Sequence, residues 1–100
     1  MAQALILEFD GIGQAEYEAV NGRLGVEMGR SDGDWPAGLL FHAGAAKAGG
    51  GLIVYEIWES QDDQDRFMRD RLGQALQESG VAGPPARVEW LEHLSSVTPD

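Results

Sequence analysis

The segment from residue 51 to residue 60 constrains the fold more than any other, because its sequence GLIVYEIWES has the pattern of a strand that is apolar on both faces. Such a strand has to be covered on both sides of its sheet. It nevertheless carries Glu56 in its middle, and Trp58 lies on the same face as Glu56. Because an isolated buried carboxylate is strongly destabilising, Glu56 has to be paired, neutralised or placed at a cavity. We therefore expect a functional site at this strand.

The N-terminal part of the chain predicts one strand and one helix. Residues 3–9 are a short run of strand-forming side chains that stops at an Asp-Gly turn signal. Apolar side chains at helical spacing then predict an amphipathic helix from about residue 13 to residue 28, weakened by Gly22 and Gly25. The apolar stripe of this helix consists of Tyr17, Val20, Leu24 and Met28.

The rest of the chain predicts a hairpin, a second helix and a last strand. Residues 39–43 form a strand that is joined to the Glu56 strand by a glycine-rich connection, so these two strands make an antiparallel hairpin. Ser60 caps a helix that runs to about Ser79 and ends at Gly80 in a left-handed conformation. Two consecutive prolines then exclude helix, and residues 87–94 are the last strand. The predicted order is βαββαβ.

This order predicts a ferredoxin-like α+β fold. Right-handed crossovers place both helices on one face of a four-stranded antiparallel sheet, and 100 residues suffice for one domain that spans 1–100. The helix-free face would then be open, yet the first and third strands carry apolar side chains on it, such as Ile6, Ile53 and Ile57. Because large apolar sheet faces are normally covered, we expect a homodimer in which two of these faces meet.

Charge and composition exclude several classes of function. Seven basic residues against seventeen acidic ones give a net charge of -10, which repels phosphate backbones and anionic lipid surfaces. We therefore expect neither nucleic acid nor a membrane as a partner. Without cysteine there is no disulfide and no thiolate nucleophile, and with only two histidines no metal site is expected. No basic, apolar leader opens the chain, which favours a cytoplasmic protein.

Glu56 and His42 are the candidate catalytic residues. Glu56 is either a general acid or base, or a structural acid that pairs with an arginine. His42 lies in a strongly apolar strand. If the hairpin centres on a single residue such as Lys47 or Ala48, His42 shares the face of Glu56, and a half-residue centre would put it on the other face. In the first register the pair would suit a base with an orienting partner, while a satisfied core histidine is the alternative.

Four further side chains are candidates for substrate contacts. Trp58 offers a flat wall for an aromatic ligand, although a large aromatic at this spacing is also typical of a core. Glu8 in the first strand is either a third polar group of the site or a strand-end acid in solvent. Tyr17 and Phe67 lie on the two helices and are expected to pack over the pocket.

The segment from Gly29 to Gly38 is expected to be a surface loop, because it is polar and rich in turn formers. Trp35 is its one large aromatic residue. We therefore predict that this loop is a mobile cover for the mouth of the pocket, with Trp35 in contact with the substrate.

The order βαββαβ and the segment Tyr55-Glu56-Ile57-Trp58-Glu59-Ser60, followed by an acidic helix start and Phe67, carry a family resemblance. Over most of its length the chain resembles the dimeric α+β barrel proteins of the antibiotic biosynthesis monooxygenase group. The resemblance implies a pocket between sheet and helices in each subunit, at the tryptophan end of this strand. In haem-degrading members a histidine follows the tryptophan by about ten residues, where this chain has Met68 and Arg69, which disfavours haem chemistry.

The resemblance implies a cofactor-independent monooxygenase. Such an enzyme would take a small apolar or aromatic substrate, polyketide-like or phenol-like, and a carboxylate or histidine would remove an acidic proton from it. If the resulting carbanion is reprotonated elsewhere, the reaction is an isomerisation or cyclisation. A non-catalytic dimer that binds a small ligand is the alternative from a different class, because one fold serves many functions.

Overall fold

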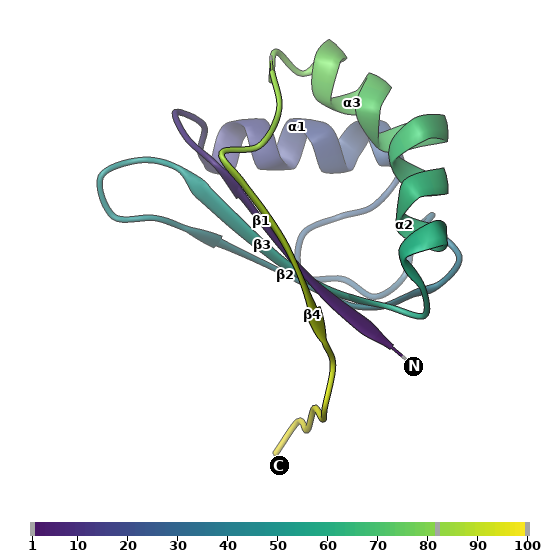
Figure 1. The fold of residues 1–100 in the computed structure, drawn as a ribbon. Coiled ribbons are helices and arrows are strands. Elements are labelled where there is room, and N and C mark those ends of the chain that lie inside the picture. Colours follow the sequence, from purple (N-terminus) through teal and green to yellow (C-terminus); the bar gives the residue numbers. More distant parts are fainter. Residues whose placement is uncertain (1, 82, 100) are drawn as a thin grey trace.

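A four-stranded antiparallel sheet with its helices on one face forms the structure (Figure 1). The computed structural model describes residues 2–81 and 83–99. Its elements in chain order are β1 (Gln3–Phe9), α1 (Gln14–Leu24), β2 (Leu39–Ala46), β3 (Leu52–Trp58), α2 (Gln61–Phe67), the π-helical segment η1 (Met68–Leu72), α3 (Gly73–Glu78) and β4 (Arg87–Glu92). The strands lie in the order β2-β3-β1-β4. The predicted ferredoxin-like βαββαβ fold is confirmed, with α2, η1 and α3 together forming the second helix.

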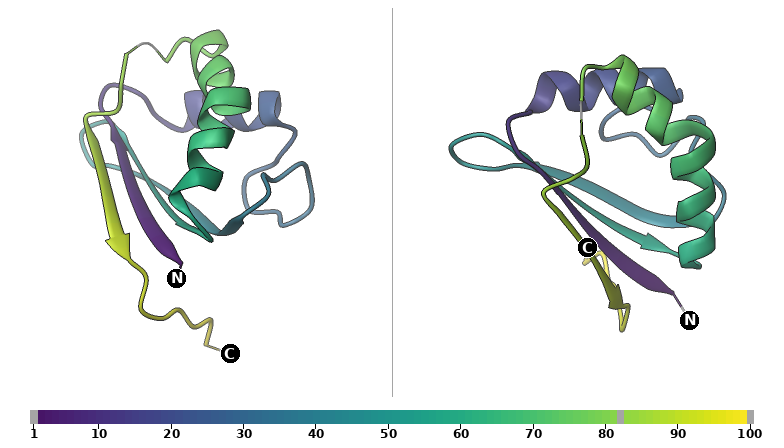
Figure 2. Two further views of the ribbon diagram at one scale, coloured as in Figure 1. Left: turned by 45° about the vertical axis from the view of Figure 1, so that its right-hand side comes forward. Right: turned by 45° about the horizontal axis from the view of Figure 1, so that its top comes forward.

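The core lies between the sheet and the helices, as the two further views show (Figure 2). β1 and β3 are the central strands, and alternate side chains of each face the helices. The buried core includes Leu5, Leu7, Phe9, Val20, Leu52, Val54, Trp58 and Phe67. Each large apolar side chain that is buried in this way contributes about 1.5–3 kcal/mol, so the helix-facing side of the sheet holds most of the stabilising contacts.

The first helix is shorter than its apolar stripe predicts. It ends at Leu24 because Gly25 adopts a left-handed conformation with φ of 80° and its N–H bonds back to the last turn. Val26 then pairs with Gly33 in an isolated bridge, which closes the loop that follows. Met28, predicted to be the last residue of the stripe, lies outside the helix and is 45% exposed. The prediction of a helix to residue 28 is therefore wrong.

The second helix contains a π-helical segment that its sequence did not indicate. Ser60 caps its start, since the Ser60 hydroxyl accepts from the backbone N–H of Asp63 at 3.2 Å, and Gly80 after its end has φ of 82° as predicted. Between α2 and α3, the five residues of η1 are wound more widely than an α-helix. No helix in the described part of the chain is long and apolar enough to cross a membrane.

The hairpin of β2 and β3 has the register that aligns His42 with Glu56. The two residues are direct partners, and the pairing is symmetric about Gly49. β2 continues to Ala46, three residues beyond its predicted end, because the turn is closed only by the pair of Lys47 and Gly51. An irregularity between Leu39 and Phe41 lies at the start of β2. Since direct partners share a face, His42 and Glu56 both point toward the helices.

Candidate functional site

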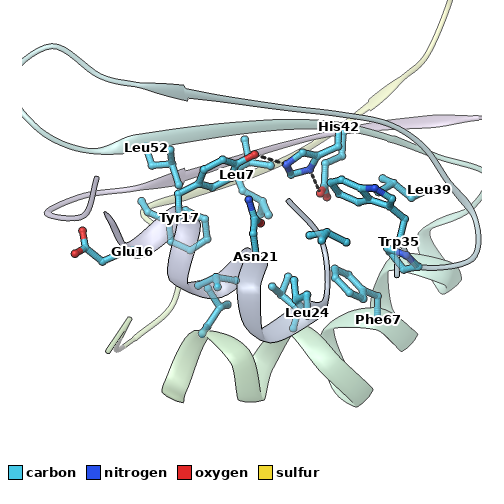
Figure 3. A pocket seen from close by; sticks show the side chains of 18 of the residues that line it. Leu7, Glu16, Tyr17, Asn21, Leu24, Trp35, Leu39, His42, Leu52 and Phe67 are labelled. Atoms are coloured by element: carbon cyan, nitrogen blue, oxygen red, sulfur yellow. Dashed lines mark hydrogen bonds and ion pairs between the residues drawn. The ribbon is translucent and has the colours of Figure 1, made fainter. Parts of the chain in front are cut away.

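A cavity of about 60 Å³ lies between the helix-facing side of the sheet and α1 (Figure 3). Much of its wall is apolar and includes Leu7, Phe9, Val20, Leu24, Leu52, Val54 and Phe67. Its polar lining consists of Glu16, Tyr17, Asn21, Asp34, His42 and Glu56. A mostly apolar cavity with a few convergent polar groups is the usual form of a small-molecule site, so this cavity is the candidate functional site.

Glu56 is a buried carboxylate whose two oxygens both have partners. β3 directs it toward the helices, and the residue is only 5% exposed. Its Oε1 accepts a hydrogen bond from the indole Nε1 of Trp58 at 3.0 Å, and its Oε2 lies 2.8 Å from Nδ1 of His42. These partners explain how a carboxylate is tolerated in an apolar wall, since a buried charge is stable only when paired and hydrogen-bonded.

His42 connects Glu56 to Tyr17. Its Nε2 lies 2.6 Å from the hydroxyl of Tyr17, so both ring nitrogens are engaged. With an ionised Glu56, which can only accept, and a neutral ring, Nδ1 of His42 is the donor and Nε2 keeps a lone pair. The Tyr17 hydroxyl then donates to Nε2. We call Trp58, Glu56, His42 and Tyr17 the Glu56 network; its basic atom toward the cavity is Nε2 of His42.

Tyr17 comes from α1 and lies flat against His42. The two rings are parallel within 2° and their centroids are 5.9 Å apart. Burial raises the pKa of Tyr17, the nearby Asn21 amide acts in the opposite direction, and the Glu56 carboxylate raises the pKa further. A Cβ at Gly44 of β2 would lie 2.8 Å from the Tyr17 ring, so only glycine at this position lets the ring approach the strand.

Trp35 covers His42 from the loop of residues 25–38. The centroid of its indole lies 5.3 Å from that of the His42 ring, with the planes tilted by 46°. The indole Nε1 donates to the carbonyl of Arg30 at 3.3 Å, within the same loop. The loop therefore lies where a cover of the pocket mouth was predicted, and its mobility stays a prediction.

Arg71 ties this loop to the second helix. From η1, its Nη2 donates to the carbonyl oxygens of Leu24 at 2.8 Å and of Asp34 at 2.7 Å, and its guanidinium lies over the ring of Phe67. The contacts join the two ends of the loop to one side chain. No pattern in the sequence indicates this role of Arg71, because its placement depends on the π-helical turn.

An open groove of about 650 Å³ runs along β2 on the other side of the same residues. Tyr17, Trp35, Leu39 and His42 line both the groove and the cavity, so these four side chains form the partition between the two spaces. The closed cavity is smaller than the roughly 300–1,000 Å³ of typical ligand pockets. A ligand larger than a few water molecules would therefore require this partition to move.

Two of the predicted site residues lie away from the cavity wall. Trp58 is 0% exposed, packs against Phe67 and donates a hydrogen bond to Glu56, so of the two alternatives it is a core residue and not a wall for a ligand. Glu8 is on the helix-free face, where its Oε2 pairs with Nζ of Lys47 at 2.7 Å. The structure thus brings Tyr17, Trp35, His42, Glu56 and Phe67 together at the cavity and leaves Trp58 and Glu8 outside it.

Asn21 is a site residue that the sequence analysis missed. It is not part of the apolar stripe of its helix, yet it is only 6% exposed and lines the cavity one helical turn after Tyr17. Its Nδ2 finds no hydrogen-bond partner among the residues that the structure describes. Spacing alone could have indicated this position, since residues four apart share a helix face.

The described residues contain no group of three or more His, Cys, Asp or Glu side chains arranged to hold a metal ion. At the cavity, Glu56 and His42 would supply two ligands. Both already take part in the Glu56 network.

Comparisons with known proteins identify the fold. No protein-family model matches the sequence, and no curated protein sequence matches it. A proposed antibiotic biosynthesis monooxygenase from Chloroflexus aurantiacus J-10-fl has a similar structure, with a TM-score of 0.67 and 13% identity over 98% of this chain and 98% of its own. A protein of unknown function from Nitrosomonas europaea is similar with a TM-score of 0.66 and 14% identity, over 99% of this chain and 95% of its own.

A monooxygenase from Streptomyces coelicolor, encoded by ActVA-Orf6 and solved in complex with the ligand nanaomycin D, is also similar. Its TM-score is 0.57 and its identity 21%, over 99% of this chain and 92% of its own. Because these identities are low, the likeness is one of fold. The resemblance to structures of the antibiotic biosynthesis monooxygenase group, with their α+β fold, is therefore confirmed at the level of the fold.

Proposed function

We propose that this protein is an enzyme that removes a proton from a small apolar or aromatic molecule without a cofactor. The observation that carries the proposal is the Glu56 network at the wall of an apolar cavity, with Nε2 of His42 as its basic atom. The fold shared with monooxygenases, one of them bound to nanaomycin D, supports a polyketide-like or phenol-like substrate. Other proteins of this fold have no known function, so the activity rests on the site.

In the proposed reaction an acidic hydrogen of the substrate replaces the Tyr17 hydroxyl at Nε2 of His42. Proton transfer to Nε2 makes an imidazolium, and the carboxylate of Glu56, 2.8 Å from Nδ1, stabilises the new charge. Trp58 holds the other oxygen of Glu56 and so keeps the carboxylate aimed at the ring. The apolar wall strengthens these interactions relative to water.

Oxygenation follows if the resulting carbanion meets molecular oxygen. The electron pair of the carbanion forms a C–O bond to dioxygen, and the resulting peroxide takes up the proton held on His42. Loss of the second hydrogen from the same carbon then supplies the electron pair that forms the carbonyl and breaks the O–O bond, and the outer oxygen leaves as water, so a methylene becomes a ketone. Return of the proton to a different carbon would instead be an isomerisation. The two outcomes differ in oxygen consumption, which makes them separable by measurement.

Anthrone is a suitable test substrate, because its methylene hydrogens are acidic and its oxidation gives a quinone. We expect the protein to accelerate oxygen uptake by anthrone, and Glu56→Gln to lower the rate by roughly 10²–10⁴-fold, the usual contribution of general acid–base catalysis. A glutamine at this position donates to Nδ1 of His42, which moves the ring proton to Nε2 and removes the base. An oxygen electrode and the absorbance of the quinone follow the reaction.

Glu59→Gln is the matched control, because it makes the same chemical change at an exposed carboxylate just past β3. It should retain the full rate. If Glu56→Gln also retains it, Glu56 is a structural acid and the proposed mechanism is wrong. If the wild type binds anthrone and neither oxidises nor isomerises it, a ligand-binding function replaces the enzymatic one.

We also propose that the protein is a homodimer that associates through the helix-free face of the sheet. Two observations support it: Phe41 and Leu91 on this face are 46% and 39% exposed, and Phe41 packs on Tyr55 from the neighbouring strand. The ion pair of Glu8 and Lys47 lies toward one end of the face. An apolar centre with charged groups at its margin is the usual composition of a subunit interface.

A further inference from the structure

Asn21 places a polar amide in the mostly apolar wall of the cavity. The residue is 6% exposed, and its Nδ2 has no hydrogen-bond partner within the described residues. A buried donor without a partner destabilises a protein, and such groups are rare in native structures. Leucine has the same branching at Cγ, is larger and apolar, and would extend into the apolar cavity without this penalty. The amide at this position therefore calls for a role outside the folded chain itself.

The amide is aimed at the same space as the basic atom of the Glu56 network. Asn21 follows Tyr17 by one helical turn on α1, and its side chain points from the helix toward the sheet, beside Tyr17 and His42 (Figure 3). It lies near enough to the Tyr17 hydroxyl to lower the pKa of Tyr17, without a hydrogen bond of ordinary geometry. An oxygen atom that displaced the Tyr17 hydroxyl from Nε2 of His42 would thus come close to Nδ2 of Asn21.

We infer that Asn21 is a ligand-binding residue whose Nδ2 donates a hydrogen bond to the oxygen of a phenol or an enolisable ketone, while the acidic hydrogen of that ligand faces Nε2 of His42. This inference rests on the proposed function and defines its substrate class. The two nitrogens complement each other, because Nδ2 of Asn21 donates to the ligand oxygen and Nε2 of His42 accepts the ligand proton.

The same contact would stabilise the product of proton transfer. When the proton moves from the ligand to Nε2 of His42, the negative charge appears on the phenolate or enolate oxygen, and the N–H of Asn21 is already directed at it. Preorganised donors at a developing oxyanion act in this way in other enzymes, and burial strengthens the effect. The unpartnered amide is then the stability cost of a prepared binding site.

The probes 4-nitrophenol and nitrobenzene test this contact, because they have the same ring and nitro group and differ by one hydroxyl. We expect the wild type to bind 4-nitrophenol more tightly than nitrobenzene in equilibrium dialysis. Asn21→Leu should reduce this preference about tenfold, the loss expected for one hydrogen bond to the ligand, and leave nitrobenzene affinity unchanged. Without ligand, Asn21→Leu should raise the midpoint of thermal unfolding by about 4–8 °C, because the unpartnered amide is gone.

Asn21→Asp is the second variant, since it has the same shape but can only accept a hydrogen bond from a ligand. Asn21→Asp should lose the preference for 4-nitrophenol as well. If Asn21→Leu does not fold, Asn21→Asp alone tests whether Asn21 donates to the ligand. A preference that survives in both variants, or a wild type that binds neither probe, overturns the inference. The variant Glu56→Gln distinguishes failure of this inference from failure of the proposed function. If Glu56→Gln abolishes the preference for 4-nitrophenol while both Asn21 variants keep it, His42 is still supported as the base and the role inferred for Asn21 is wrong.

Discussion

Glu56 stays buried in an apolar wall because each of its oxygens accepts a hydrogen bond, one from Trp58 and one from His42. At the scale of single residues, burial also acts on Tyr17, the last member of the Glu56 network. Its hydroxyl is held at Nε2 of His42 in a partly buried position, where the neutral form is favoured and the pKa is raised. This shift links the stability of the fold to pH.

The raised pKa of Tyr17 predicts a loss of stability at alkaline pH. In the unfolded chain a tyrosine titrates near pH 10, and in the folded protein Tyr17 titrates above that value. The stabilising contribution is therefore complete below pH 10 and is lost as the pH rises through the folded-state pKa. Urea unfolding of the wild type should show a falling free energy of unfolding between pH 9 and pH 11, and Tyr17→Phe should flatten this slope.

Tyr55→Phe controls for the general effect of removing a tyrosine, because Tyr55 lies on the helix-free face of β3, away from the network. Its unfolding should retain the alkaline slope of the wild type. Equal slopes for Tyr17→Phe and the wild type would show that Tyr17 does not carry the linkage.

At the scale of elements, the loop of residues 25–38 is held by hydrogen bonds from the π-helical segment η1. The loop places Trp35 over His42, and Arg71 of η1 holds the loop through the carbonyl oxygens of Leu24 and Asp34. Periodicity in the sequence identifies both a helix and a loop here, but an apolar stripe does not distinguish α-helical from π-helical winding over five residues. The contacts by which Arg71 holds the loop could therefore not be predicted from the sequence.

Removing the hydrogen bonds of Arg71 should make the loop of residues 25–38 more mobile. Arg71→Met keeps much of the apolar stem and removes the donors to Leu24 and Asp34, and hydrogen bonds from a charged group typically contribute about 1.5–3 kcal/mol. Because Arg71 is partly exposed, we expect the lower end of this range, which corresponds to about tenfold faster amide exchange in residues 25–38. Hydrogen–deuterium exchange followed by mass spectrometry measures it.

Arg69→Met is the matched control, because Arg69 is in the same π-helical segment and pairs with its exposed neighbour Asp70. Exchange in the loop should stay at the wild-type rate in this variant. Equal exchange in Arg71→Met and Arg69→Met would mean that the loop is held by its own contacts, such as the bridge of Val26 and Gly33.

At the scale of the whole molecule, the two faces of the sheet differ in how far they are covered. The helix-facing side is covered within the subunit, whereas the helix-free side exposes Phe41 and Leu91 on its two edge strands, β2 and β4. Beyond β4 the C-terminal segment extends away from the sheet and exposes Leu94 and Val97 (Figure 1). These exposed apolar side chains motivate the proposed dimer, since isolated subunits rarely leave such a surface to water.

The proposed dimer predicts that Ile53→Asp dissociates the protein. Ile53 is partly buried on the helix-free face, and a carboxylate there would be buried without a partner in the interface. Ile57 is on the same face but is only 3% exposed within the subunit, so its replacement would also damage the monomer. Sedimentation equilibrium should give a dimer for the wild type and the monomer mass of 10.8 kDa for Ile53→Asp.

Val88→Asp serves as the control, because Val88 is also exposed but lies on the helix-facing side of β4. This variant should sediment like the wild type. A wild type that sediments as a monomer at micromolar concentration would contradict the proposed dimer, whatever the variants do.

The order of the elements and the strand that carries the site could be predicted from the sequence. Alternation and helical periodicity are local properties of a chain, and turn residues end each element, so βαββαβ and the buried position of Glu56 followed from neighbouring residues alone. Several element ends also followed, such as the cap at Ser60 and the end at Gly80. The end of α1 could not be predicted, because Gly25 and the bridge of Val26 end the helix before the last residue of its apolar stripe.

Which of the candidate residues contact one another depends on the packing of the folded chain. The pairing of His42 with Glu56 depends on how the hairpin turn closes, and a shift by one residue would have separated them. The burial of Asn21 and the choice between core and ligand wall for Trp58 were decided in the same way, by what packs against α1 and β3 from distant parts of the chain. Local patterns specify which side chains share a face, whereas contacts between faces depend on closure and packing of the whole fold.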